Sequence, residues 1–167
     1  TNALLLEKKL HLFKPSPYLF FSVHLDGLKE HHDRAVCQDG VFDRAVVAIK
    51  TAQDKGFQVN VNATIFDGMS ADDVAAFLDF TADLGIGVNI TPGYAYERAP
   101  DQAHFLSRQR TKNLFREVFR LGKRKKWQIN HSPLYLDFLA GNQTYKCSPW
   151  GTPTRNVFGW QRPCYLL

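Results

Sequence analysis

The sequence predicts an α/β protein with a parallel sheet, and three observations carry this prediction. Apolar or alternating segments of strand length recur at residues 18–27, 57–68 and 87–93. Segments with apolar residues at helical spacing lie between them and after them. Alternation of strands and helices along a chain builds parallel sheets, which are open or closed into a barrel. In both architectures the working residues lie on the loops that leave the carboxyl ends of the strands.

The first two strand–helix units have clear signals. Residues 18–27 form a near-continuous apolar run that closes on Asp-Gly, which is typical of a buried strand and its exit turn. Residues 41–57 place apolar side chains on one face of a helix that stops at Gly56. Residues 57–68 alternate valine and alanine with polar residues, which predicts a second strand. A helix follows over 69–86, with Ser70 as its N-cap.

The remaining elements are read in the same way. Residues 87–93 predict a third strand that ends at Pro-Gly, and a long helix is expected from about Ala103 to Leu121. Residues 127–132 are interpreted as a fourth strand, and 133–141 as a short helix that ends at a glycine. The last 26 residues contain three prolines, two glycines and several large rings, so no regular secondary structure is expected there.

Composition limits the classes that remain. The 167 residues suffice for one domain, and 44% of them are hydrophobic. No apolar run approaches the roughly 18 residues needed to span a bilayer, and no secretory signal pattern is present. Cys37, Cys147 and Cys164 are odd in number and show no C-x-x-C spacing, so we expect free thiols and a cytoplasmic protein. The chain begins without methionine and ends on an apolar tail, so we expect a piece of a longer protein.

The net charge of +5 is concentrated between Arg108 and Lys126, a segment called here the cationic stripe. It favours an anionic partner, which would be lipid head groups, nucleic acid or a phosphorylated substrate. A solvated helix face is the alternative explanation.

Polar residues cluster at the predicted strand ends. Ser22, His24 and Asp26 alternate, so they point to one side of the first strand and suit a polar ligand, with Asp26 placed to accept from ribose hydroxyls. The alternative is an interior histidine and a turn aspartate. Asn60 and Asn62 share one face of the second strand, which would also fit a strand with one wet side.

Between the first strand and the next helix lies the stretch Lys29–Arg34, which contains His31, His32 and Asp33. Adjacent residues seldom face one ion together and no H-x-x-x-H spacing occurs, so no metal ligands are assigned and the stretch is expected to be mostly solvated loop. Arg34 could hold a carboxylate or phosphate.

The loop after the third strand carries two tyrosines and an ion pair between two prolines, which suits a binding loop or an ordinary surface loop. Its candidate residues are Tyr94, Tyr96, Glu97 and Arg98. Farther along, Trp150 and Trp160 would line an apolar cavity or cover a barrel mouth, while Cys147 and Cys164 are by default buried structural cysteines.

Residues 21–62, "FSVHLDGLKEHHDRAVCQDGVFDRAVVAIKTAQDKGFQVNVN", resemble the middle of a radical S-adenosylmethionine enzyme. That superfamily has a strand ending in S-x-D-G, a His-Asp region and a G-x-F-D helix start, and Asn2 resembles the Thr-Asn turn before it. The strings "TPGYAYERAPDQAHFL" and "FLAGNQTYKCSPWGTPTRNVFGWQRPCYLL" resemble the hopanoid-biosynthesis branch, the adenosylhopene transferases. The resemblance covers essentially the whole chain.

The resemblance implies the C-terminal part of a partial (β/α)6 TIM-like barrel, with strands 3 to 6 in residues 1–140. Residues 141–167 would begin an aromatic, loop-rich C-terminal extension. The implied reaction adds a 5′-deoxyadenosyl radical, made from S-adenosylmethionine at a [4Fe–4S] cluster, to diploptene and gives adenosylhopane. The cluster motif C-x-x-x-C-x-x-C is absent and would lie N-terminal to Thr1, so the chain alone is expected to be inactive.

Roles for individual residues follow from the residues and the resemblance together. S-adenosylmethionine would be bound by Ser22, His24, Asp26, Asn60 and Asn62, with Arg34 meeting its carboxylate. The substrate would be bound by Tyr94, Tyr96, Glu97, Arg98, Trp150 and Trp160. The product radical needs a hydrogen atom, for which Cys164 is the first candidate thiol and Cys147 the second; ligation of an auxiliary cluster is the competing role of Cys164.

The implied partners are the hopene lipid diploptene and an electron donor such as flavodoxin or ferredoxin, with no role for nucleic acid. The cationic stripe would let a cytoplasmic enzyme rest on the anionic inner face of the membrane. Two alternatives stay open: a radical enzyme that acts on a peptide or another substrate, and a basic module that binds anionic lipid or nucleic acid.

Overall fold

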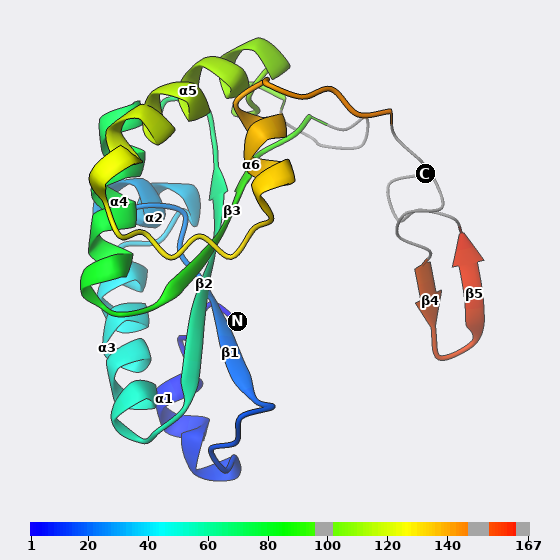
Figure 1. The fold of residues 1–167 in the computed structure, drawn as a ribbon. Helices are drawn as coiled ribbons and strands as arrows, with labels where there is room; N and C mark the ends of the chain where they lie inside the picture. Colours follow the sequence, from blue (N-terminus) through cyan, green and yellow to red (C-terminus); the bar gives the residue numbers. More distant parts are fainter. Residues whose placement is uncertain (96–101, 147–153, 163–167) are drawn as a thin grey trace.

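A computed structural model of the chain describes residues 1–95, 102–146 and 154–162 (Figure 1). The helices are α1 (Leu6–Lys9), η1 (Leu10–Leu12), α2 (Lys29–Ala35), α3 (Val41–Asp54), α4 (Ala71–Asp83), α5 (Arg108–Leu121), η2 (Gly122–Arg124) and α6 (Pro133–Leu139). The strands are β1 (Phe20–His24), β2 (Gln58–Ile65), β3 (Gly87–Pro92), β4 (Thr154–Asn156) and β5 (Gly159–Arg162).

Strands β1, β2 and β3 form a parallel sheet in chain order, so the predicted α/β class is confirmed. Helices α3 and α4 cover one face of this sheet, as Figure 1 shows. The hydrophobic core lies between the sheet and these helices, because alternate strand residues are buried against the helices. Its strand residues are Val23, Val59, Val61, Ala63, Ile65, Val88 and Ile90.

The helix boundaries follow from local chemistry. Ser70 caps α4 as predicted, and it forms a reciprocal capping box with Asp73. Helix α5 begins at Arg108, not at the expected Ala103, because the Ser107 side chain accepts from the Arg110 N–H and so defines the start. Just before that cap, the Leu106 N–H donates to the Gly93 carbonyl and holds the chain beside the end of β3.

The fourth strand expected at 127–132 is wrong, because only a single parallel bridge joins Val88 and Ile129. The Val88 N–H donates to the Gln128 carbonyl, and the Asn130 N–H donates to the Val88 carbonyl. The ladder stops there because the next free donor, the Ile90 N–H, donates to Nε2 of His131. The His131 side chain thus accepts the hydrogen bond that the backbone carbonyl of a neighbouring strand would otherwise accept.

Two stretches expected to lack regular structure contain it. Residues Lys29–Ala35 form helix α2, with His32 and Asp33 buried, so the expected solvated loop is wrong. Strands β4 and β5 form an antiparallel hairpin within the aromatic C-terminal segment. None of the described helices is long and apolar enough to cross a membrane.

Candidate functional site

One face of the sheet carries a grid of polar side chains. The register places Ser22 beside Asn60, and His24 beside Asn62, which in turn lies beside Asn89. Side chains at paired positions of a parallel sheet point to the same side, so these groups share the face opposite the core. They are half-buried or exposed, while their strand neighbours are buried. The structure therefore brings together four of the predicted site residues: Ser22, His24, Asn60 and Asn62.

Asp26 ties the carboxyl ends of β1 and β2 together. Its Oδ1 accepts from the Thr64 N–H at 2.7 Å, and it lies 2.7 Å from Nε2 of His24. Asp26 is only 3% exposed, whereas the His24 side chain is 38% exposed. The hydrogen bond to Asp26 raises the pKa of His24 above its ordinary value and outweighs partial burial. His24 thus lies partly exposed on this face, and Asp26 holds it from behind.

His32 lies behind this pair and is fully buried. Its Nδ1 accepts from the Asp26 N–H at 3.2 Å, and its ring meets the His24 ring edge-on with centroids 5.8 Å apart. Burial lowers the pKa of His32, which favours the neutral ring with its proton on Nε2. That Nε2 has no hydrogen-bond partner within the described part of the chain. His32 fixes the backbone of Asp26 and does not face a ligand.

Asp33 is a structural cap for α3. Its two carboxylate oxygens accept from the Gly40 N–H at 2.7 Å and from the Phe42 N–H at 2.8 Å. These bonds lower the pKa of Asp33. Among residues 1–95, 102–146 and 154–162 no group of three or more histidine, cysteine or acidic side chains could hold a metal ion. Arg34 is exposed on α2, and its side chain pairs with none of the described residues.

The face also contains residues that the sequence reading missed. A Cβ at Gly87 would lie 2.5 Å from the side-chain amide of Asn130, so Asn130 reaches over Gly87 from outside the sheet. Gly87 pairs with Asn60, and Asn130 therefore occupies the next place in that row. Asn89 could have been found from its alternation with Val88 and Ile90, as Asn60 was. No local sequence pattern indicates Asn130, because its position depends on its contact with Gly87, 43 residues earlier in the chain.

A second cluster lies after β3. Tyr94 and Tyr135 share a side-chain hydrogen bond, and burial raises the pKa of both phenols. The Arg108 guanidinium lies 3.8 Å from the centroid of the Phe138 ring, and it donates to the Phe138 carbonyl. The ring of His131 is 4.5 Å from that of Tyr135, measured between centroids. Of the predicted substrate residues, the structure therefore places Tyr94 in an aromatic cluster with α6.

Trp160 lies on β5 and is 54% exposed. The other predicted residues, Tyr96, Glu97, Arg98, Cys147, Trp150 and Cys164, lie outside the described residues. Their assigned roles stay predictions.

Comparisons with known proteins agree with this architecture. Residues 88–167 match the family described as "Domain of unknown function (DUF3463)". The chain is 32% identical over 69 residues to GTP 3′,8-cyclase 1 of Pseudomonas aeruginosa, a match that covers 41% of the chain and 21% of that relative. The structure titled "Native anSMEcpe with bound AdoMet" superposes with a TM-score of 0.61 at 14% identity, over 92% of this chain and 45% of that one.

Streptococcus suis SuiB superposes with a TM-score of 0.54 at 16% identity, over 80% of this chain and 32% of that one. The fold is therefore that of part of the barrel of radical S-adenosylmethionine enzymes, as the sequence predicted. The local similarity to the cyclase supports the same superfamily. The chain spans less than half the length of each of these proteins, and the hopanoid branch stays a prediction.

Proposed function

We propose that this chain is part of a radical S-adenosylmethionine enzyme and that the polar face of its sheet helps to bind the cofactor. One observation carries the proposal: Ser22, His24, Asn60 and Asn62 form adjacent rows on the uncovered sheet face, within a fold that is also found with bound AdoMet. Ligands of parallel α/β folds bind at the carboxyl ends of the strands. The His24–Asn62 row lies nearer to that end than the Ser22–Asn60 row, and two adjacent rows of polar groups suit a nucleoside.

The donor set fits this cofactor chemically. Carboxamides, a hydroxyl and an imidazole can donate to and accept from ribose hydroxyls and an adenine edge without bringing an unpaired charge to the face. Arg34, exposed after β1 without a described partner, suits the cofactor carboxylate. Bound next to a reduced [4Fe–4S] cluster, S-adenosylmethionine supplies a 5′-deoxyadenosyl radical. Cluster ligands are expected N-terminal to Thr1.

Within this proposal the residues divide into contact and support. His24 is the exposed partner of the His24–Asp26 pair, so it contacts the ligand. Asp26 is a positioning residue, because its Oδ1 is already engaged by His24 and the Thr64 N–H. This modifies the predicted contact between Asp26 and the ribose, because only the second carboxylate oxygen of Asp26, Oδ2, would be left to accept from a ribose hydroxyl.

For the substrate we propose a hopene, diploptene, with adenosylhopane as the product. The support is the resemblance of residues 91–106 and 138–167 to adenosylhopene transferases and the aromatic character of the second segment. A thiol would supply the final hydrogen atom, with Cys164 proposed before Cys147. An electron donor such as flavodoxin or ferredoxin would reduce the cluster.

A second candidate is an enzyme that modifies a peptide. One structure with the same fold, at a TM-score of 0.56 and 14% identity, is titled "Native anSMEcpe with bound AdoMet and Kp18Cys peptide". A peptide would need polar partners for its amides, and the Tyr94–Tyr135 pair at the end of β3 offers hydroxyls of that kind.

The test uses the whole protein to which this chain belongs, purified without oxygen and reconstituted with iron and sulfide. Dithionite, S-adenosylmethionine and diploptene are added, and mass spectrometry searches for an adenosylated hopane. The adduct is the expected result. Formation of 5′-deoxyadenosine alone would refute the hopene and favour the peptide candidate, and absence of both products despite an intact cluster would refute the enzyme.

Cofactor binding is measured separately by calorimetry. Asn60→Ala is expected to weaken S-adenosylmethionine binding about tenfold, the effect of one lost hydrogen bond of about 1.4 kcal/mol. Gln58→Ala is the matched control, because Gln58 shares the face with Asn60 but pairs with Phe20 and so lies outside the two polar rows. Equal effects of the two substitutions would contradict a site on these rows.

A further inference from the structure

The cations of the stripe differ in whether another group of the fold holds their side chains. Arg110 pairs with Asp67 at 2.7 Å, and Lys125 pairs with Asp79 at 2.9 Å. Arg120 forms an ion pair with Glu117. Arg108 and Arg116 donate to the carbonyls of Phe138 and Ala140. Most of the stripe along α5 is thus used for contacts within the fold.

The free charges gather where α5 ends. Lys123, Arg124 and Lys126 are exposed, and none of them pairs with an acidic residue within the described ranges. They lie within four residues of one another in η2 and the turn after it. Asp83 lines a neighbouring hollow with Lys126 but forms no ion pair with it. Along α5, Arg108, Lys112 and Arg116 also lack an acidic partner in the described ranges, but Arg108 and Lys112 are only partly exposed and Arg116 is held by a carbonyl. The exposed cations with no described partner therefore gather in this turn.

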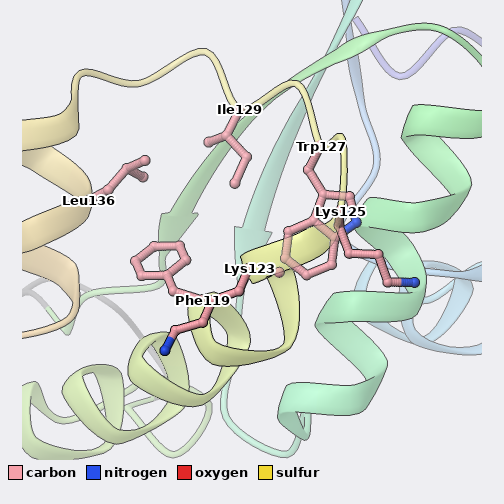
Figure 2. Close-up of a pocket in the computed structure, with 7 residues that line it drawn as sticks. Phe119, Lys123, Lys125, Trp127, Ile129 and Leu136 are labelled. Carbon is pink, nitrogen blue, oxygen red and sulfur yellow. The ribbon is translucent and has the colours of Figure 1, made fainter.

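An apolar hollow of about 260 Å³ adjoins these charges, and Figure 2 shows its wall. The wall consists of Phe119, Trp127, Ile129 and Leu136, with Lys123 and Lys125 at the rim. The indole ring of Trp127 lies against Gly122, where a Cβ would come within 2.3 Å of it. The Trp127 Nε1 donates to Asp79 at 2.8 Å, so this ring is fixed.

We propose that this surface, the η2 surface, docks the protein on an anionic phospholipid bilayer. Charge complementarity identifies the occupant: three free cations attract anionic head groups, and the adjoining hollow accepts apolar groups from the interface. Tryptophan, with an apolar body and a polar edge, is enriched at membrane interfaces. The η2 surface shares no residue with the polar sheet face, so the docking does not depend on which substrate the enzyme takes.

The test measures binding of the whole protein to sedimented vesicles. Vesicles of phosphatidylcholine and phosphatidylglycerol in equal parts are compared with vesicles of phosphatidylcholine alone. The variant Lys123→Gln/Arg124→Gln/Lys126→Gln is expected to bind anionic vesicles on the order of 100-fold more weakly, at roughly fivefold per basic residue. The matched control Lys8→Gln/Lys9→Gln/Lys14→Gln removes the same charge from exposed residues of the N-terminal segment.

A second pair of variants tests the apolar part. Leu136→Ser is expected to weaken vesicle binding several-fold, because Leu136 lines the hollow. Leu134→Ser removes a leucine that is 64% exposed on the same helix and lies outside the hollow, so it should bind as the native protein does. Circular dichroism checks that each variant is folded.

Three outcomes would overturn the proposal. Native protein that binds neutral vesicles as well as anionic ones would remove the electrostatic basis. Equal losses in the two triple variants would show a general effect of net charge. Tighter binding to a nucleic-acid duplex than to anionic vesicles, lost in the η2 variant, would assign the surface to a different partner.

Discussion

Replacing Asp26 by alanine should show how much the carboxylate holds the site together. The change removes two interactions, the 2.7 Å hydrogen bond from the partly buried Thr64 N–H and the 2.7 Å contact with His24. The first leaves a donor without a partner and costs about 2 kcal/mol, and the second, half-exposed to solvent, costs about 1 kcal/mol. We expect Asp26→Ala to lower the free energy of unfolding by about 3 kcal/mol.

Urea unfolding followed by circular dichroism measures this difference, with m-values compared to confirm the same transition. Asp26→Asn keeps an acceptor for the Thr64 N–H and loses the charge, so about a third of the loss is expected. A cost below about 0.5 kcal/mol for Asp26→Ala would refute the positioning role. An asparagine variant as unstable as the alanine variant would also refute the positioning role, because the retained acceptor would then contribute nothing to stability.

The same pair predicts a pH dependence. The pKa of His24 is raised above its ordinary 6.5 in the folded chain. Its stabilising effect is therefore fully present below pH 6.5 and is lost as the pH rises through the folded pKa. NMR titration should show the pKa of His24 falling in Asp26→Asn. An unchanged pKa would mean that the imidazole does not interact with this carboxylate.

Three further predictions concern the support around the site. Asp33→Ala should lower stability above the ordinary carboxyl pKa of 3.8, with the difference disappearing as the pH falls through the lower folded value; acid unfolding checks this. Arg108→Met should raise the pKa of Tyr94 further, because the guanidinium now lowers it, and an unchanged ultraviolet phenol titration would contradict this. Gly87→Ala should cost about 1 kcal/mol, since its Cβ would meet the Asn130 amide, and Asn130→Ala should restore much of that loss.

The sheet could be predicted because its pattern is local. Every second residue of β2 is buried under the helices, so the alternation of Val59 and Val61 with Asn60 appears directly in the sequence. The fourth strand could not be predicted correctly, because its pairing depends on one competing side-chain acceptor, Nε2 of His131. Ile90 gives its N–H to His131, and no property of residues 127–132 alone reveals this.

The charged stretch after β1 was misjudged for a similar reason. His32 and Asp33 read as solvated when taken by residue type, yet both are buried. Their cost of burial is offset by backbone donors from residues far from their own turn: Asp26 for the imidazole, Gly40 and Phe42 for the carboxylate. Sequence alone gives the residue types, but the partners that make burial tolerable are a product of the fold.

Arg108 shows how the fold changes the meaning of a charge. In the sequence it belongs to the cationic stripe, whereas in the structure it joins the start of α5 to α6. Its guanidinium stacks on the Phe138 ring and donates to the Phe138 carbonyl, an arrangement that lysine could not reproduce with the same planar fork. Packing therefore accounts for part of this cation, while its buried Nη1 has no hydrogen-bond partner in the described part of the chain. A hydrocarbon substrate and a peptide are both compatible with such an arginine, so the choice between them depends on the reaction products and not on charge near β3.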